Sequence, residues 1–65
     1  MDNNFSKNLK TLRIQANLSQ KDLAERLNVS YKSISHWESG YAEPSIEILK
    51  ELKDVFEVSY DDLLE

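Results

Sequence analysis

The sequence predicts an all-α fold, a single small domain of five helices within 65 residues. Apolar residues recur at helical spacing along nearly the whole chain, and glycine and proline, which interrupt helices, occur once each. A chain of this size buries only about three-fifths of the surface that its unfolded form exposes, which leaves little room for a catalytic cavity. Cysteine is absent and histidine occurs once, so we expect an apolar core without a disulfide or a metal site. We also expect that the protein is not an enzyme.

The first helix is expected to begin at Phe5 or Ser6 and to end at about Ala16, before Asn17 and Leu18. Its apolar side chains share one stripe, as in a helix that covers a core. This stripe consists of Phe5, Leu9, Leu12 and Ala16.

The second helix is expected from Gln20 to Leu27. Ser19 precedes it and is a favourable N-cap, because a serine hydroxyl accepts a hydrogen bond from an unpaired amide of the first turn. Asn28, which tolerates left-handed backbone, ends this helix. The inward-facing residues are Leu23, Ala24 and Leu27.

Ser30 caps a third helix that runs to about Ser39, where Gly40 stops it. Residues 41–44 form a loop, because Pro44 cannot continue a helix and restricts the residue before it to extended backbone. Ile34 and Trp37 are expected to face inward.

The fourth helix is expected from Ile46 to Phe56, after Ser45, and a fifth short helix follows Ser59. Asp62 stands three residues after Ser59, as in a capping box. The fourth helix carries an apolar stripe of Ile46, Leu49, Leu52 and Phe56, and the short fifth helix contains Leu63 and Leu64. The expected core of the whole domain is Leu9, Leu12, Leu23, Ala24, Leu27, Val29, Ile34, Trp37, Leu49, Leu52 and Phe56.

Residues 19–38 have the pattern of a helix-turn-helix, in which two short helices are joined by a tight turn. Small Ala24 allows the two helices to cross closely, and Val29 fills the space beneath the turn. Ile34 and Trp37 then fix the inner face of the second helix of the motif.

Two segments carry a resemblance to a known family: residues 18–24, Leu-Ser-Gln-Lys-Asp-Leu-Ala, and residues 34–40, Ile-Ser-His-Trp-Glu-Ser-Gly, followed by Pro44 and Leu49. They closely resemble the lambda-repressor-like family, also called XRE-type, which includes phage repressors and Cro proteins. The resemblance covers roughly Lys7 to Leu64. It implies a five-helix DNA-binding domain that is usually dimeric and acts in transcription.

The third helix supplies the candidate base contacts. At 100° per residue its buried side lies between Ile34 and Trp37, so Lys32, His36 and Ser39 point away from the core. The N-terminal part of such a helix meets base edges in the major groove, and the resemblance places Tyr31, Lys32 and His36 at base-contacting positions. The expected base-contacting residues are Tyr31, Lys32, Ser35 and His36.

Phosphate contacts are expected at the positive end of the second helix, where Gln20 lies. The resemblance gives Gln20 the same role and places residues 39–41 against the opposite strand. The expected phosphate-contacting residues are Ser19, Gln20, Lys21, Ser39 and Tyr41. Unlike the well-known phage repressors, the loop of residues 41–44 has no Lys or Arg and contains Glu43, so binding by a single subunit is expected to be weak or salt-sensitive.

The resemblance also pairs Arg13 with Glu38, as a structural ion bridge between the first helix and the end of the third. It further implies a homodimer formed through the fifth helix and the loop before it, on a palindromic operator with half-sites about one helical turn apart. The candidate interface residues are Val58, Tyr60, Leu63 and Leu64, of which the two leucines are more apolar than a free chain end requires.

The charge leaves two interpretations open. Residues 1–40 carry six basic and four acidic side chains, whereas residues 41–65 carry two basic and eight acidic ones, and the net charge is −4. Gln20, Lys32 and the motif spacing favour a sequence-specific double-stranded DNA-binding regulator of bacterial or phage type, most simply a repressor. The acidity favours the alternative, a protein-interaction module on a helix-turn-helix scaffold with marginal DNA affinity.

The remaining expectations concern location and ligands. No signal-peptide pattern and no apolar run of about 18 residues occurs, so a soluble, cytoplasmic protein that does not enter a membrane is expected. No cofactor, metal or small-molecule ligand is expected. Asp22, Ser33 and His36 are not taken as a catalytic triad, because nothing in the pattern orients them.

Overall fold

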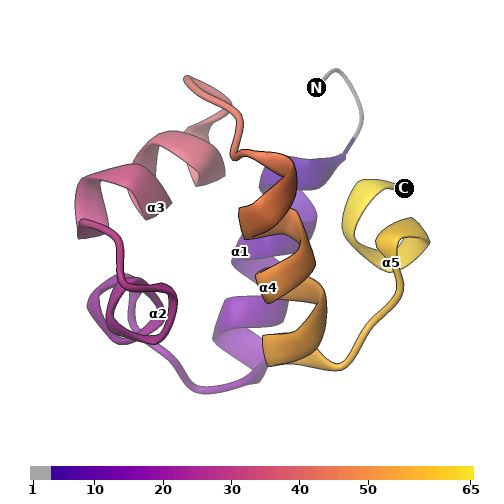
Figure 1. The fold of residues 1–65 in the computed structure, drawn as a ribbon, viewed down its shortest axis with the longest axis horizontal. Helices are drawn as coiled ribbons and strands as arrows, with labels where there is room; N and C mark the ends of the chain where they lie inside the picture. The colour runs from indigo at the N-terminus through magenta and orange to yellow at the C-terminus, as the bar shows by residue number, and fades with distance from the viewer. Residues whose placement is uncertain (1–3) are drawn as a thin grey trace.

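The computed structural model describes residues 4–65, which form five α-helices and no strand (Figure 1). The helices are α1 (Phe5–Gln15), α2 (Gln20–Leu27), α3 (Tyr31–Ser39), α4 (Ile46–Phe56) and α5 (Tyr60–Leu64). The predicted all-α fold is confirmed, and α2, α3 and α4 have the expected bounds. In α1 the last helical residue is Gln15, one position before the expected end.

A serine caps the N-terminus of each helix from α2 to α5. Each hydroxyl oxygen accepts a hydrogen bond from the backbone N–H three residues further on, at 2.9 to 3.3 Å. In α2 and α5 the bond is reciprocated, because Asp22 and Asp62 accept from the N–H of their own capping serine. Such a cap contributes about 1 kcal/mol relative to alanine. The capping residues are Ser19, Ser30, Ser45 and Ser59.

The first four helices end in one common turn. After each helix one residue adopts positive φ, and the N–H of the next residue donates to the carbonyl oxygen five positions earlier, at 2.9 to 3.1 Å. This is the Schellman motif, which pairs carbonyls that a helix end leaves unbonded. The residues with positive φ are Asn17, Asn28, Gly40 and Glu57.

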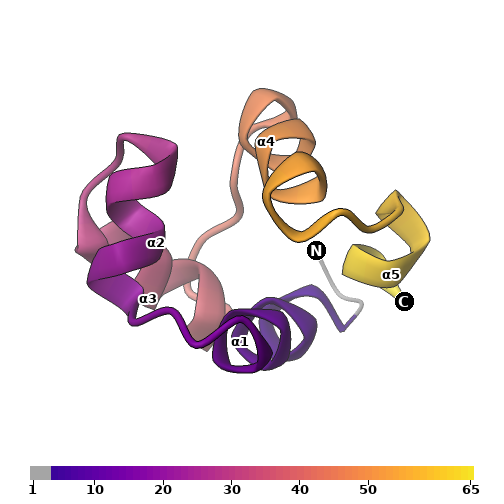
Figure 2. The same ribbon diagram turned by 90° about the horizontal axis from the view of Figure 1, so that it is seen from below.

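The helices are arranged around a core to which every one of them contributes. The α2–α3 pair lies at one end of the molecule and α5 at the other, with α1 and α4 between them (Figure 2). Eight of the eleven expected core residues are buried, whereas Leu12, Val29 and Phe56 are half-buried and pack against the core. The buried residues of this hydrophobic core are Phe5, Leu9, Leu23, Ala24, Leu27, Ile34, Trp37, Leu49, Leu52 and Leu63.

Two positions assigned to apolar stripes are exposed. Ile46 is 76% exposed. It is the first residue of α4, and because a helical Cβ points toward the N-terminus, its side chain projects past the end of the helix. Ala16 is also exposed, since it lies beyond the last residue of α1.

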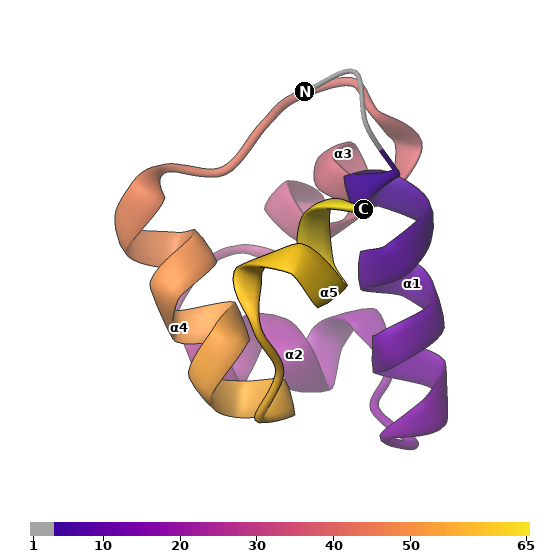
Figure 3. The same ribbon diagram turned by 90° about the vertical axis from the view of Figure 1, so that its right-hand side faces the viewer.

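The five-residue helix α5 is held against α1 (Figure 3). Asn8 donates from Nδ2 to the Leu63 carbonyl oxygen at 3.1 Å, and Asn4 donates to that of Glu65 at 3.0 Å. A helix this short is stable only when it is docked, and Leu63 is fully buried between its neighbours. The expectation that Leu63 lies on a partner surface is therefore wrong, because this side chain belongs to the domain's own core.

The longest helices between residues 4 and 65 are α1 and α4, with 11 residues each. None of the described helices is long and apolar enough to cross a membrane.

Candidate nucleic-acid interface

The segment from α2 to α3 folds as the expected helix-turn-helix. Ala24 is buried at the crossing of the two helices, and its carbonyl oxygen accepts from the Val29 N–H at 3.0 Å. Val29 packs half-buried against the core beneath the turn. Ile34 is fully buried and Trp37 is 7% exposed, so one side of α3 is fixed against the domain.

The opposite side of α3 carries the expected base-contacting residues. Tyr31 is 60% exposed at the start of the helix, and Lys32 beside it is also exposed. Ser35 and His36 are half-buried one turn further on. The four side chains therefore lie on one helix, with the more accessible pair at its N-terminal end, where a helix of this type meets base edges.

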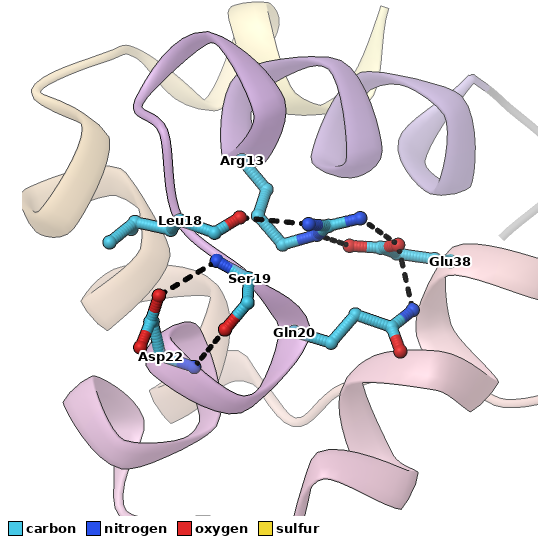
Figure 4. A network of polar contacts seen from close by, with 6 residues as sticks. All are labelled: Arg13, Leu18, Ser19, Gln20, Asp22 and Glu38. Atoms are coloured by element: carbon cyan, nitrogen blue, oxygen red, sulfur yellow. Dashed lines mark hydrogen bonds and ion pairs between the residues drawn. The ribbon is translucent and has the colours of Figure 1, made fainter.

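Three helices converge on the Glu38 carboxylate, whose side chain is only 4% exposed. Arg13 of α1 donates from Nε to Oε2 at 2.6 Å and from Nη2 to Oε1 at 3.2 Å, and its Nη1 donates to the Leu18 carbonyl oxygen at 2.8 Å (Figure 4). Gln20 of α2 donates from Nε2 to Oε1 of Glu38 at 3.1 Å. This polar network links the end of α1, the start of α2 and the C-terminal half of α3.

The structure places Gln20 in that network, which the sequence pattern did not indicate directly. A signal does exist, because Gln20 lies four residues before Ala24 and so shares the helix face that crosses α3. The amide group has two N–H protons, and the bond to Glu38 uses one of them. The other remains available for an anion beside the N-terminus of α2.

The remaining expected phosphate contacts lie at both ends of the motif. Ser19 and Lys21 are exposed at the start of α2. Ser39 is also exposed, but its hydroxyl donates to the His36 carbonyl oxygen at 3.1 Å and accepts from the Tyr41 N–H at 3.4 Å. The Ser39 hydroxyl therefore stabilises the turn after α3. Tyr41 follows this turn and is 79% exposed.

One acidic group also lies at the start of α2. The carboxylate of Asp22 accepts a hydrogen bond from the Ser19 N–H, and this bond, with the Ser19 side chain, lowers the pKa of the carboxyl below the usual value of 3.8. Asp22 is thus ionised near neutral pH, on the end of the helix whose free amide groups favour negative charge.

This fold and the exposed face of α3 define a helix-turn-helix domain. A family model described as helix-turn-helix matches residues 9–63. The chain belongs to this family, in its lambda-repressor-like, XRE-type branch.

Similar proteins place the domain in several contexts. Over 60 residues the chain is 47% identical to the HTH-type transcriptional activator BcrR of Enterococcus faecalis, covering 92% of this chain and 29% of BcrR. The P22 c2 repressor, solved with a synthetic operator, matches with a TM-score of 0.87 and 30% identity over 94% of this chain and 92% of the repressor. Hydroxypropylphosphonic acid epoxidase from S. wedmorenis matches with a TM-score of 0.87 and 25% identity, over 97% of this chain and 34% of the enzyme. The chain spans 29% to 52% of the length of the curated relatives it matches.

Proposed function

We propose that this chain is the DNA-contacting domain of a transcriptional regulator, which inserts α3 into the major groove of double-stranded DNA. The observation that carries the proposal is the division of α3 into two faces. Ile34 and Trp37 fix its inner face, while Tyr31 and Lys32 are exposed at the end that meets base edges. Lys32 would donate to guanine O6 or N7, and His36 to an acceptor one turn further on.

The start of α2 would anchor the domain to one phosphate strand. The first amide groups of a helix lack partners within it and attract anions. Beside them, Gln20 would bridge Glu38 and a phosphate oxygen with its two N–H protons. Ser19 and Lys21 would add a hydroxyl and a positive charge, and Ser39, at the other end of the motif, would face the other strand.

The distribution of charge fits this orientation. Asp61, Asp62 and Glu65 belong to or follow α5, at the opposite end of the molecule from α2 and α3 (Figure 2). With a Debye length of about 8 Å at physiological salt, these charges are largely screened from DNA at the far end. Asp22 lies in the first turn of α2 and Glu43 follows Tyr41 by two residues, so these acidic side chains should weaken DNA binding by a single subunit.

We infer that two copies act together on a palindromic operator. Leu63 is unavailable, and Val58 and Leu64 are half-buried against the core. Tyr60 is 40% exposed, with the Lys53 Nζ 4.8 Å from its ring centroid. The interface proposed through α5 is therefore reduced to Tyr60 with the exposed edges of Val58 and Leu64.

Repression is the simplest outcome of such binding, because an occupied promoter excludes polymerase without a further contact. BcrR is named an activator, and ImmR of Bacillus subtilis, 37% identical, a regulator, so a promoter reporter assay must establish the sign for this chain. We assign no catalytic residue and no cofactor. In a bacterial cell, a regulator of this kind would act in the cytoplasm, where the DNA lies.

The test is selection from a randomised duplex library at moderate salt, with the double variant Lys32→Ala, His36→Ala run beside the parent. Enrichment of a palindromic site that the variant loses supports base contact by α3, and the half-site spacing reports the dimer. Enrichment that the variant shares would overturn the base-contact assignment. Absence of enrichment in the parent would favour the second candidate, the protein-interaction module that the net charge of −4 suggests.

A further inference from the structure

The C-terminal end of α3 carries an aromatic contact for which the proposed function gives no role. The rings of His36 and Tyr41 lie 4.7 Å apart between centroids, with an interplanar angle of 51°. Aromatic rings at this separation and tilt attract one another. Because Tyr41 is 79% exposed, its ring contributes little to the core.

The backbone determines where Tyr41 stands relative to His36. Gly40 has a positive φ of 81°, and the Tyr41 N–H donates to the His36 carbonyl oxygen at 2.9 Å. The Ala42 N–H donates to the same oxygen at 3.2 Å, and the Ser39 hydroxyl at 3.1 Å. In a Schellman motif the side chains at these two positions frequently meet, so the turn favours the ring contact.

The imidazole of His36 is oriented by packing and by the contact with Tyr41, without a hydrogen bond from the described residues. No group within residues 4–65 forms a hydrogen bond with its ring nitrogens, and the side chain is half-buried. A side chain that is free to rotate loses that freedom when it binds a base, whereas one already restricted loses less. A ring that covers part of the imidazole supplies this restriction before DNA arrives.

We propose that Tyr41 is a positioning residue that orients His36 for contact with a base edge, and not itself a phosphate contact. The inference rests on the proposed function, since it requires α3 to contact bases. It assigns part of the sequence specificity to a residue outside the recognition helix.

The test compares the parent with Tyr41→Ala, Tyr41→Phe, His36→Ala and the double variant of Tyr41→Ala with His36→Ala. Each protein is titrated against the site selected by the parent and against all its single base-pair substitutions. His36→Ala should reduce discrimination at one or two base pairs, and Tyr41→Ala should reduce it at the same base pairs by about twofold to tenfold. Tyr41→Phe should retain discrimination, and the double variant should be no worse than His36→Ala alone.

A different pattern would overturn the proposal. One such pattern is that Tyr41→Ala and Tyr41→Phe each weaken binding to every sequence alike, and that Tyr41→Ala does so equally when His36 is already replaced by alanine. In that case the Tyr41 hydroxyl contacts phosphate directly. Because Tyr41 is exposed, a folding defect is not expected, and circular dichroism checks this.

The proton NMR spectrum of His36 in the free protein separates failure of this inference from failure of the proposed function. Tyr41→Ala should change the imidazole proton shifts, because the ring current of Tyr41 is lost. Unchanged shifts would overturn the positioning role whatever the DNA results are. If the shifts change but the parent selects no DNA sequence, the ring contact exists and the proposed function is wrong. The role of Tyr41 in DNA discrimination is then wrong as well.

Discussion

Gln20 and Glu38, eighteen residues apart and on different helices, are joined by a hydrogen bond of 3.1 Å. Glu38 also receives both bonds from Arg13, so one nearly buried carboxylate is shared between a structural partner and a residue of the proposed phosphate contact. Any change in this carboxylate should therefore affect both the stability of the domain and the position of Gln20.

Arg13→Met should lower the free energy of unfolding by about 3 kcal/mol, because it leaves the Glu38 charge buried with only an amide partner. The added change Glu38→Gln should restore part of that loss, since a neutral amide at position 38 no longer carries an unpaired charge. Urea denaturation measures both. Equal stability of the single and double variants would contradict a role for the buried charge.

Gln20→Ala and Lys21→Ala should weaken DNA binding in different ways. Gln20 is neutral, so its loss should reduce affinity for every sequence by roughly tenfold to a hundredfold, as for a hydrogen bond to a charged group of about 1.5 to 3 kcal/mol. The slope of log affinity against log salt should not change. Lys21→Ala should reduce that slope by about 1. Fluorescence anisotropy at several salt concentrations measures both effects, and a changed slope for Gln20→Ala would contradict the assignment.

The lowered pKa of Asp22 predicts that the free energy of unfolding decreases in acid. The hydrogen bonds from Ser19 lower its pKa in the folded state below 3.8, so its contribution is complete at pH values above the unfolded pKa and is lost as the pH falls through the folded pKa. Asp22→Asn keeps the shape of the cap and removes the titration. The difference in stability between parent and variant should shrink below about pH 4. A difference that stays constant from pH 6 to pH 2 would contradict this explanation.

Glu57 and Gly40 occupy equivalent turns with different residues. Both have positive φ, 54° at Glu57 and 81° at Gly40, a conformation that costs a non-glycine residue about 1 kcal/mol. Glu57→Gly should therefore stabilise the domain by up to about 1 kcal/mol, and Gly40→Ala should destabilise it by a similar amount. A Cβ at Gly40 would meet only the Ser6 Oγ at 3.5 Å, so the cost there arises from the backbone. Thermal unfolding of the two variants tests the pair.

Local signals in the sequence predicted the helices well. A capping serine and a residue that accepts left-handed backbone both act within one turn of the chain, so the bounds of α2 and α3 needed no tertiary information. The same reasoning did not identify Glu57 as a turn residue, because glutamate is not favoured at positive φ and Val58 with its docked neighbours must stabilise the turn.

The predicted burial of a side chain is wrong where its exposure depends on how neighbouring helices pack. Ile46 fits the apolar period of α4, but no other helix covers its end. Leu63 is predicted at a partner surface from the resemblance and from its apolar character, because a five-residue pattern does not show which of its side chains docks on α1. In the candidate site, the exposed face of α3 followed from helical geometry, whereas the bond between Gln20 and Glu38 depends on how α2 crosses α3.

The proposed dimer predicts different effects for substitutions of Leu63, a core residue, and of Tyr60, a candidate interface residue. Leu63→Ala should destabilise the monomer by about 2 to 5 kcal/mol, because it leaves a cavity in the core. Tyr60→Ala should change unfolding by less, since the ring is 40% exposed, and should instead raise the dissociation constant of the dimer and of its complex with a two-half-site operator. Sedimentation equilibrium and binding to single and paired half-sites measure this. If Tyr60→Ala leaves both unchanged, α5 is not the interface; Ile14, 54% exposed on α1, is then the next apolar position to test.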